Sequence, residues 1–175
     1  MEKVESKTKR IIKRKNGRII RLGTDWILIR VEELQGMFEE VEKVLQSGSS
    51  VVWYCAGKGA GRSMGKMLLS RFKKARSFED FWTKFKDFIE RSGWGIIKEV
   101  TIREDGGESI IRIYDNAFAR RRHSTHPSCF FLKGYIEGIT EILTGRHVTC
   151  YETECIAKGD PYCEFHIIVE PRNKN

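Results

Sequence analysis

The sequence has no apolar run that approaches the roughly 18 residues needed by a membrane-spanning helix. The stretch Trp26-Ile27-Leu28-Ile29 is among its longest apolar runs. No hydrophobic region of the kind found in signal peptides follows the basic N-terminus. We therefore expect a cytoplasmic protein without a membrane span. In that compartment clustered cysteines are more often metal ligands than disulfides, and the odd count of five weighs against a full disulfide framework.

Signatures of phosphate binding and catalysis are also missing. Ala60 stands where a phosphate-binding loop ending at Gly65-Lys66 needs a glycine, and Met67 stands where it needs serine or threonine. The dinucleotide-binding spacing fails because Met64 occupies the position of its last glycine. We recognise no catalytic triad, pair of acid and base carboxylates or redox-cofactor motif. These absences favour a binding protein over an enzyme.

The glycines of this segment instead predict close helix packing. Gly57, Gly61 and Gly65 are four residues apart, so on a helix they form one bare stripe. Such a stripe lets another backbone approach closely, although each glycine costs up to about 1 kcal/mol relative to alanine. We predict a helix over residues 56–75 with a tightly packed face. The apolar run at 51–55 before it fits a buried strand or the first turns of this helix.

The net charge of +8 is concentrated at the N-terminus. Residues 1–22 hold nine basic and two acidic side chains, and the rest of the chain is close to neutral. Such an arm can tether nucleic acid or another polyanion, or it can be a solvated terminus. The lack of interleaved aromatic residues favours the solvated terminus. We expect a basic flexible arm over residues 1–16 and a single domain over residues 17–171.

Periodicity and turn signals predict the order of the elements. They indicate strands at 17–22 and 26–31, helices at 31–45, 56–75 and 78–91, strands at 94–103 and 109–114, a helix from Pro127 to Leu143, and strands at 147–153 and 162–169. Ser77 caps the third helix, whose aromatic stripe indicates a core face. This order predicts an α+β fold, a mainly antiparallel sheet with helices packed on one side.

The segment Cys150–His166 concentrates the candidate metal ligands. It holds three cysteines, three glutamates and one histidine, with a Gly-Asp-Pro turn between two strands. Zinc is bound by thiolate, imidazole and carboxylate groups, and four protein ligands make a closed structural site. The alternatives are a Cys155–Cys163 disulfide and free buried thiols. The candidates are Cys129, Cys150, Glu152, Glu154, Cys155, Cys163 and His166.

Strand parity sorts these candidates only in part. Cys155 and Cys163 flank the turn, so a hairpin brings them together. His166 is three residues after Cys163 and points to the other face of the strand, which makes it a weaker candidate. Glu152 and Cys155 are also three apart and share a site only if the strand bends or ends between them. Parity alone therefore leaves the choice between Glu152 and Glu154 open.

The spacing Cys129-x22-Glu152-x2-Cys155-x7-Cys163, with Gly-Asp before the last cysteine, resembles the 4-vinyl-reductase domain family. Sensor domains of phenol-responsive transcription activators belong to that family. The resemblance covers roughly residues 17–169, but its sharp motifs lie in the C-terminal 45 or so. It implies that these four residues hold a structural Zn²⁺. It also implies a fold shared with subunits of the vesicle-tethering complex TRAPP, with an apolar cavity between helices and sheet and often a homodimer.

The resemblance leads to a functional expectation. We expect a stand-alone domain that binds a small hydrophobic or aromatic molecule and acts through a regulatory protein partner. Cys150 falls where those sensors have a cavity-lining aromatic residue, so it is a candidate ligand contact and indicates a different ligand. One alternative is an enzyme of tetrapyrrole or aromatic metabolism. The other is a nucleic-acid-associated protein that uses the basic arm.

Overall fold

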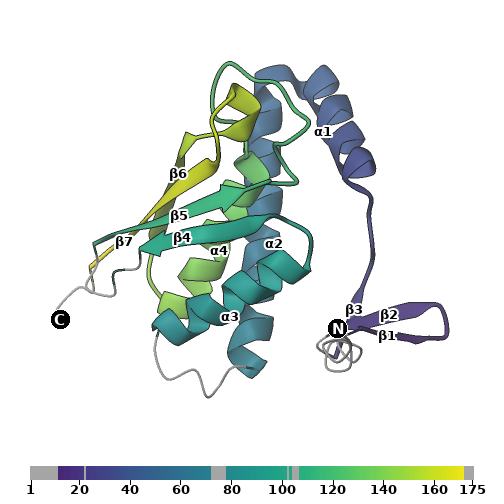
Figure 1. Cartoon of the computed structure of the whole chain (residues 1–175), viewed down its shortest axis with the longest axis vertical. Coiled ribbons are helices and arrows are strands. Elements are labelled where there is room, and N and C mark those ends of the chain that lie inside the picture. Colours follow the sequence, from purple (N-terminus) through teal and green to yellow (C-terminus); the bar gives the residue numbers. More distant parts are fainter. Residues whose placement is uncertain (1–11, 22, 72–77, 102, 104–106, 172–175) are drawn as a thin grey trace, which may run out of the picture. The chain divides into compact units, whose positions relative to one another are not determined.

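A computed structural model describes residues 12–21, 23–71, 78–101, 103 and 107–171 (Figure 1). The chain divides into two compact units, Met1–Leu34 and Gln35–Asn175, and each is described by itself. Residues 1–11 of the predicted arm and the predicted cap Ser77 lie outside the described residues. Within the described part of the chain, no helix is both long and apolar enough to cross a membrane.

The first unit contains a three-stranded antiparallel sheet of β1 (Ile12–Lys15), β2 (Arg18–Arg21) and β3 (Thr24–Trp26). Residues 12–15, expected to be mobile, instead form β1. Asn16 and Gly17 have φ values of 50° and 73°, which fit the two-residue hairpin turn that favours Asn-Gly. The Asn16-Gly17 dipeptide is thus the sequence signal that predicts the hairpin of β1 and β2. The predicted strand over 26–31 is also wrong, because β3 ends at Trp26.

The second unit begins within α1 (Val31–Leu45), whose bounds match the prediction, as do those of α3. The run at 51–55, left open by its periodicity, is helical. The other elements are η1 (Gln46–Gly48), α2 (Ser49–Arg71), α3 (Phe78–Arg91), β4 (Ile96–Thr101), β5 (Glu108–Tyr114), α4 (Phe130–Thr144), β6 (Val148–Glu154), η2 (Ile156–Lys158) and β7 (Cys163–Val169).

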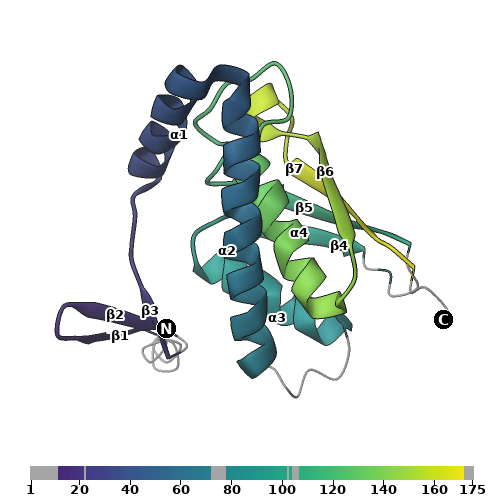
Figure 2. The same ribbon diagram turned by 180° about the vertical axis from the view of Figure 1, so that it is seen from behind.

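The four-stranded sheet has the order β4-β5-β7-β6, with every neighbouring pair antiparallel. α4 packs against β6 and β7, α2 packs on α4, and α3 lies beside β4 (Figure 1; Figure 2). The helix-facing side of the sheet is apolar and buried, with Ile97, Ile111, Ile113, Phe165, Ile167 and Val169 each at most 3% exposed. This arrangement confirms the predicted α+β fold.

Glycines hold α2 and α4 at close range, as the bare stripe predicts. A Cβ atom at Gly57 would lie 1.9 Å from a main-chain oxygen of α4, and one at Gly61 would lie 2.2 Å from the carbonyl oxygen of Tyr135. The approach is reciprocal, because a Cβ atom at Gly134 of α4 would lie 2.2 Å from the carbonyl oxygen of Tyr54. No side chain fits between the two backbones at these positions.

The solvent-facing side of the sheet carries a polar network around His166. Its Nδ1 lies 2.8 Å from Oε1 of Glu108, and its Nε2 lies 2.9 Å from Oε1 of Glu164. Burial opposes the charged form of His166, but hydrogen bonds with Glu164 and Glu108 raise its pKa. Burial likewise opposes ionisation of Glu164, but hydrogen bonds from Arg112, His166 and Thr153 lower its pKa to about 2. The network stabilises the fold while His166 carries a proton.

This network makes the free energy of unfolding depend on pH. Below the unfolded-state pKa of histidine, about 6.5, the His166 contribution is fully present. As the pH rises through the raised folded-state pKa, the contribution is lost. The stability difference between the wild type and His166→Gln, measured by urea unfolding, is expected to be largest near pH ~5.5 and to shrink toward pH ~9. A difference that stays constant or grows over this range would contradict the ion-pair assignment.

Candidate metal centre

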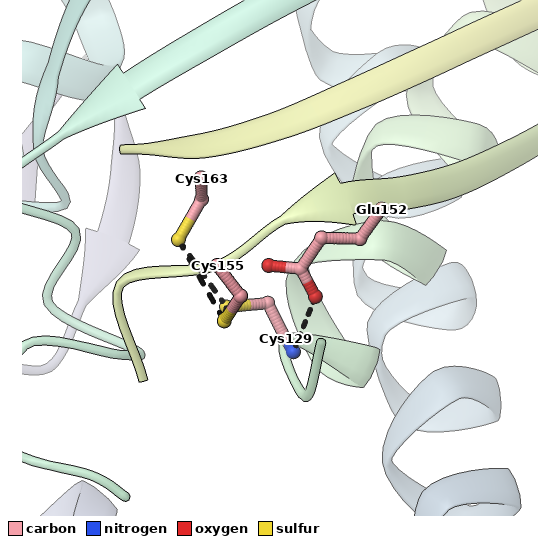
Figure 3. Close-up of side chains that lie close together, drawn as sticks. All are labelled: Cys129, Glu152, Cys155 and Cys163. Atoms are coloured by element: carbon pink, nitrogen blue, oxygen red, sulfur yellow. Dashed lines mark hydrogen bonds between the residues drawn. The ribbon is translucent and has the colours of Figure 1, made fainter. Parts of the chain in front are cut away.

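Four side chains from the C-terminal half meet at one point of the second unit (Figure 3). Cys129 precedes α4, Glu152 lies in β6, Cys155 follows β6, and Cys163 begins β7. One potential ligand atom from each lies within 4.8 Å of all the others. The sulfur of Cys129 is 3.7 Å from that of Cys155 and 3.8 Å from that of Cys163, and the last two are 4.0 Å apart. The structure therefore brings together the four residues singled out by the resemblance.

Local irregularities in the hairpin make this convergence possible. The pairing of β6 with β7 shifts register between Glu152 and Glu154, which supplies the bend that strand parity required. In the turn, the N–H of Cys155 donates to Asp160 Oδ2 at 2.8 Å. Gly159 has a φ of 106°, which favours glycine. Of the remaining candidates, Glu154 lies 3.5 Å from Lys158, and His166 belongs to the network on the outer face.

The cysteine geometry suits a tetrahedral zinc ion. A Zn–S bond of about 2.3 Å gives an S–S separation of about 3.8 Å in a tetrahedron. The three observed separations lie between 3.7 and 4.0 Å, and all three cysteines are free thiols. Oε2 of Glu152 accepts a hydrogen bond from the N–H of Cys129 at 2.8 Å. Its other oxygen, Oε1, is buried without a hydrogen-bond partner among the described residues, as expected for a carboxylate that also binds a metal.

The electrostatics of the site are those of acidic groups crowded together. Burial and the negative charge of Cys155 raise the pKa of Glu152 to about 8. Hydrogen bonds with Cys155 and Cys163, together with burial, raise the pKa of the Cys129 thiol well above its usual value. A divalent cation replaces the protons of such groups when it binds, so metal affinity and folding are coupled.

Hydrogen-bond donors lie beside the thiols of Cys129 and Cys163. The side-chain amide of Asn116 lies 3.5 Å from the sulfur of Cys129, and the N–H of Ile156 lies 3.4 Å from that of Cys163. Asn116 is fully buried, and its oxygen accepts a hydrogen bond from the N–H of Phe118 at 3.0 Å. Donors of this kind orient ligands and tune a metal site. Sequence reasoning missed Asn116, because nothing in its spacing connects it with the cysteines.

An aromatic cluster lies next to the metal centre. Its rings come from α1, α2, α4 and two loops, with neighbouring centroids 4.4 to 6.5 Å apart; the members are Phe38, Trp53, Trp94, Phe118, Phe131 and Tyr135. Four of these rings, those of Phe38, Trp53, Phe118 and Phe131, line a hollow of about 10 Å³, which Cys129 also lines; Trp94 and Tyr135 lie behind them in the cluster. Space for about one water molecule is thus left where the sequence predicts an apolar cavity.

Two polar atoms of this cluster are buried without partners among the described residues. They are Nε1 of Trp53, which lines the hollow, and the hydroxyl of Tyr135. Tyr135 is 3% exposed, and burial raises the pKa of its hydroxyl. An unpaired buried donor costs about 1–3 kcal/mol. Both atoms can therefore gain a partner from a ligand that carries an oxygen atom.

Cys150 occupies a different environment. It is 1% exposed, and burial raises the pKa of its thiol. Its N–H donates to Oε2 of Glu137, a buried residue of α4 whose Oε1 also accepts from Tyr54 and Lys58 of α2. Lys58 lies 2.9 Å from Glu141 as well. The structure places Cys150 beside this polar network and not among the residues that line the hollow.

The family model of the V4R domain matches residues 109–169, and this match confirms the resemblance found in the sequence. The matched range includes all four residues of the metal centre. The chain is 26% identical over 113 residues to the uncharacterized protein MJ0150 of Methanocaldococcus jannaschii, covering 64% of this chain and 62% of that protein. It is 28% identical over 97 residues to MJ0855 of the same organism, covering 42% of that protein. The chain thus spans less than two thirds of each relative.

Solved structures share the fold. The phenol-responsive sensory domain of the transcription activator PoxR, solved with phenol, has a TM-score of 0.79 at 17% identity and covers 91% of this chain and 85% of its own. A trafficking protein particle complex subunit 3 from Naegleria fowleri, covalently bound to palmitic acid, has a TM-score of 0.60 at 15% identity. That match covers 83% of this chain and 95% of the subunit. A vinyl-4-reductase family protein from Methanocaldococcus jannaschii has a TM-score of 0.57 at 16% identity, and the match covers 83% of this chain and 84% of that protein.

Proposed function

We propose that the protein is a zinc-stabilised domain that binds a small hydrophobic or aromatic molecule and acts through a protein partner. Cys129, Glu152, Cys155 and Cys163 hold Zn²⁺ in a closed site with four protein ligands, which leaves no position for a substrate. The metal then has a structural role. It fixes the start of α4 to the C-terminal hairpin, and α4 carries two rings of the aromatic cluster.

The aromatic cluster with its two unpartnered donors is the observation that carries the ligand-binding proposal. A molecule with an aromatic ring and an oxygen acceptor fills apolar space and pairs with Trp53 Nε1 or the Tyr135 hydroxyl. The hollow of about 10 Å³ is too small for a ring, so binding requires a shift of a neighbouring ring such as Phe131. The phenol-bound sensory domain of PoxR, which has the same fold, supports this ligand class.

The test uses phenol, 1-naphthol and palmitate as probes, with binding followed by tryptophan fluorescence. Tyr135→Phe removes one hydroxyl and is expected to weaken binding of the hydroxylated probes about tenfold, which equals about 1.4 kcal/mol. Without ligand, the same variant is expected to be more stable by about 1 kcal/mol, since it removes an unpaired buried hydroxyl. Tyr114→Phe, on the outer face of the sheet, is the matched control.

The paired readout separates ligand binding from packing. A purely structural hydroxyl predicts that Tyr135→Phe loses stability and leaves the dissociation constants unchanged, and that result would contradict the proposal. So would the failure of every probe to bind, combined with mass spectrometry that finds no small molecule in extracts of the native protein. A preference for palmitate over the ring compounds would move the ligand class to aliphatic chains.

The homodimer, the regulatory partner and a ligand contact at Cys150 are further parts of this proposal. Light scattering coupled to size-exclusion chromatography measures the first of them. The enzymatic alternative predicts turnover of a bound tetrapyrrole or aromatic compound. The nucleic-acid alternative predicts DNA or RNA binding that is lost when residues 1–15 are deleted.

A further inference from the structure

A polar cleft adjoins the hollow of the aromatic cluster, with which it shares Arg122, Ser128 and Phe130. It has a volume of about 390 Å³, within the usual range of small-molecule sites. The C-terminal half of α1, the start of α2 and the loop before α4 line it. Its lining is rich in hydrogen-bond donors, with five serines, two histidines and Arg122, and Phe130 is its single aromatic residue. This composition suits a polar ligand rather than the hydrophobic one proposed above.

The lining of the cleft includes Ser128, whose side-chain hydroxyl is buried and makes no hydrogen bond with the described residues. Ser128 is 5% exposed and also lines the aromatic hollow. Nearby, Arg122 donates from Nη1 to the carbonyl oxygen of Ser128 at 3.3 Å and from Nη2 to Glu42. A guanidinium has five N–H donors, so these two bonds leave others for a ligand.

The charges around the cleft favour an oxyanion. Glu42 is its one carboxylate, and the ion pair with Arg122 compensates it. His123 and His126 add two imidazoles from the exposed loop. Ser49 and Ser50 stand at the start of α2, a helix of 23 residues, where the helix dipole favours negative charge. The Ser50 hydroxyl donates to the carbonyl oxygen of Ser47 at 2.9 Å and the N–H of Ser49 donates to that of Gln46, so Ser49 offers its hydroxyl and Ser50 only its oxygen. Hydroxyl, guanidinium and imidazole groups that converge at a helix start are the donors that bind phosphate.

We infer that the polar cleft binds the phosphate group of a small molecule, held by the hydroxyls of Ser128 and Ser49, by Arg122 and by the dipole at the start of α2. This site is separate from the proposed hydrophobic site and does not depend on it. The two sites share a wall formed by Arg122, Ser128 and Phe130. The shared chemistry is phosphate, either as the free ion or as a phosphate ester.

The test is a titration of the full chain, labelled with ¹⁵N, with inorganic phosphate and with glucose 6-phosphate at low ionic strength, followed by NMR. Saturable shifts are expected around residues 47–50 and 122–128. Binding of both probes assigns the site to phosphate itself, and binding of the ester alone assigns it to phosphorylated metabolites. No saturable binding at millimolar concentrations, or shifts confined to other residues, would overturn the inference.

Variants sharpen this test. Ser128→Ala is expected to weaken binding at least fivefold, whereas Ser70→Ala, an exposed serine of α2 outside the cleft, leaves it unchanged. A change at Ser128 can also disturb the metal centre, because the next residue is Cys129. His123→Gln, at an exposed position of the cleft, therefore provides a second variant, which is expected to weaken phosphate binding about threefold. If all variants bound the phosphate probes with the affinity of the wild type, the inference would be contradicted. The 1-naphthol titration stays as an independent readout, so failure of the cleft and failure of the hydrophobic site are told apart.

Discussion

Replacing Cys155 by serine is expected to remove most of the protein's stability. A serine hydroxyl does not replace a thiolate as a zinc ligand, and Cys155 is fully buried among the other three ligands. Structural zinc contributes about 10–16 kcal/mol of apparent binding energy in small zinc-dependent peptides, and whole domains are stable by only about 5–15 kcal/mol. We expect the variant to be largely unfolded at 37 °C, as measured by circular dichroism and thermal melting.

Cys55→Ser is the matched control, because Cys55 is an exposed thiol on α2 away from the metal centre. Its effect should stay within about 0.5 kcal/mol. A chelator is expected to lower the melting temperature of the wild type and of Cys55→Ser, and added zinc should restore it. Neither treatment should affect Cys155→Ser. If Cys155→Ser melted at the same temperature as Cys55→Ser, the metal centre would have no structural role.

The second large effect is expected at Gly61. In Gly61→Ala the new methyl group would lie 2.2 Å from the carbonyl oxygen of Tyr135, and the obstacle is backbone that cannot turn aside. α2 and α4 must then separate along their shared interface. We expect a loss of about 3 kcal/mol or more in the free energy of unfolding, measured by urea titration with an unchanged slope.

Gly59→Ala provides the control on the same helix. Gly59 is exposed, and a Cβ atom there would have no atom within 4 Å. Because alanine is the better helix former, this variant is expected to be more stable by up to about 1 kcal/mol. Opposite signs at two positions of α2 that are two residues apart would show that helix contact, and not helix propensity, requires Gly61. A Gly61→Ala variant as stable as the wild type would contradict the close packing of α2 and α4.

The sequence predicts the elements whose signals are local. Apolar residues at helical spacing place α1 and α3 at their observed bounds, and the glycine stripe predicts the packed face of α2. The start of α4 is less predictable. Pro127 favours a helix at once, but the helix begins at Phe130, after Cys129 with its φ of −81° and ψ of 48°. The N–H of Cys129 is held by Glu152 from a distant strand.

The candidate site is predictable only in part, for the same reason. The turn brings Cys155 and Cys163 together in any hairpin, and parity turns His166 away. The choice of Glu152 over Glu154 as a metal ligand depends on a register shift in β6, which no local sequence pattern predicts. Cys129 comes from another part of the chain, just before α4, and reaches the site only in the folded structure. The aromatic cluster and the polar cleft each gather side chains from several segments. Such sites depend on tertiary contacts, which periodicity does not encode.

The metal content of the wild-type protein tests the central claim most directly. Elemental analysis of freshly purified protein, prepared without chelators, should find about one zinc ion per chain. Native mass spectrometry should show the same mass increase, with loss of protons from the ligand groups on binding. A folded protein that contains no zinc, and whose melting temperature does not rise when zinc is added, would contradict the proposed metal centre.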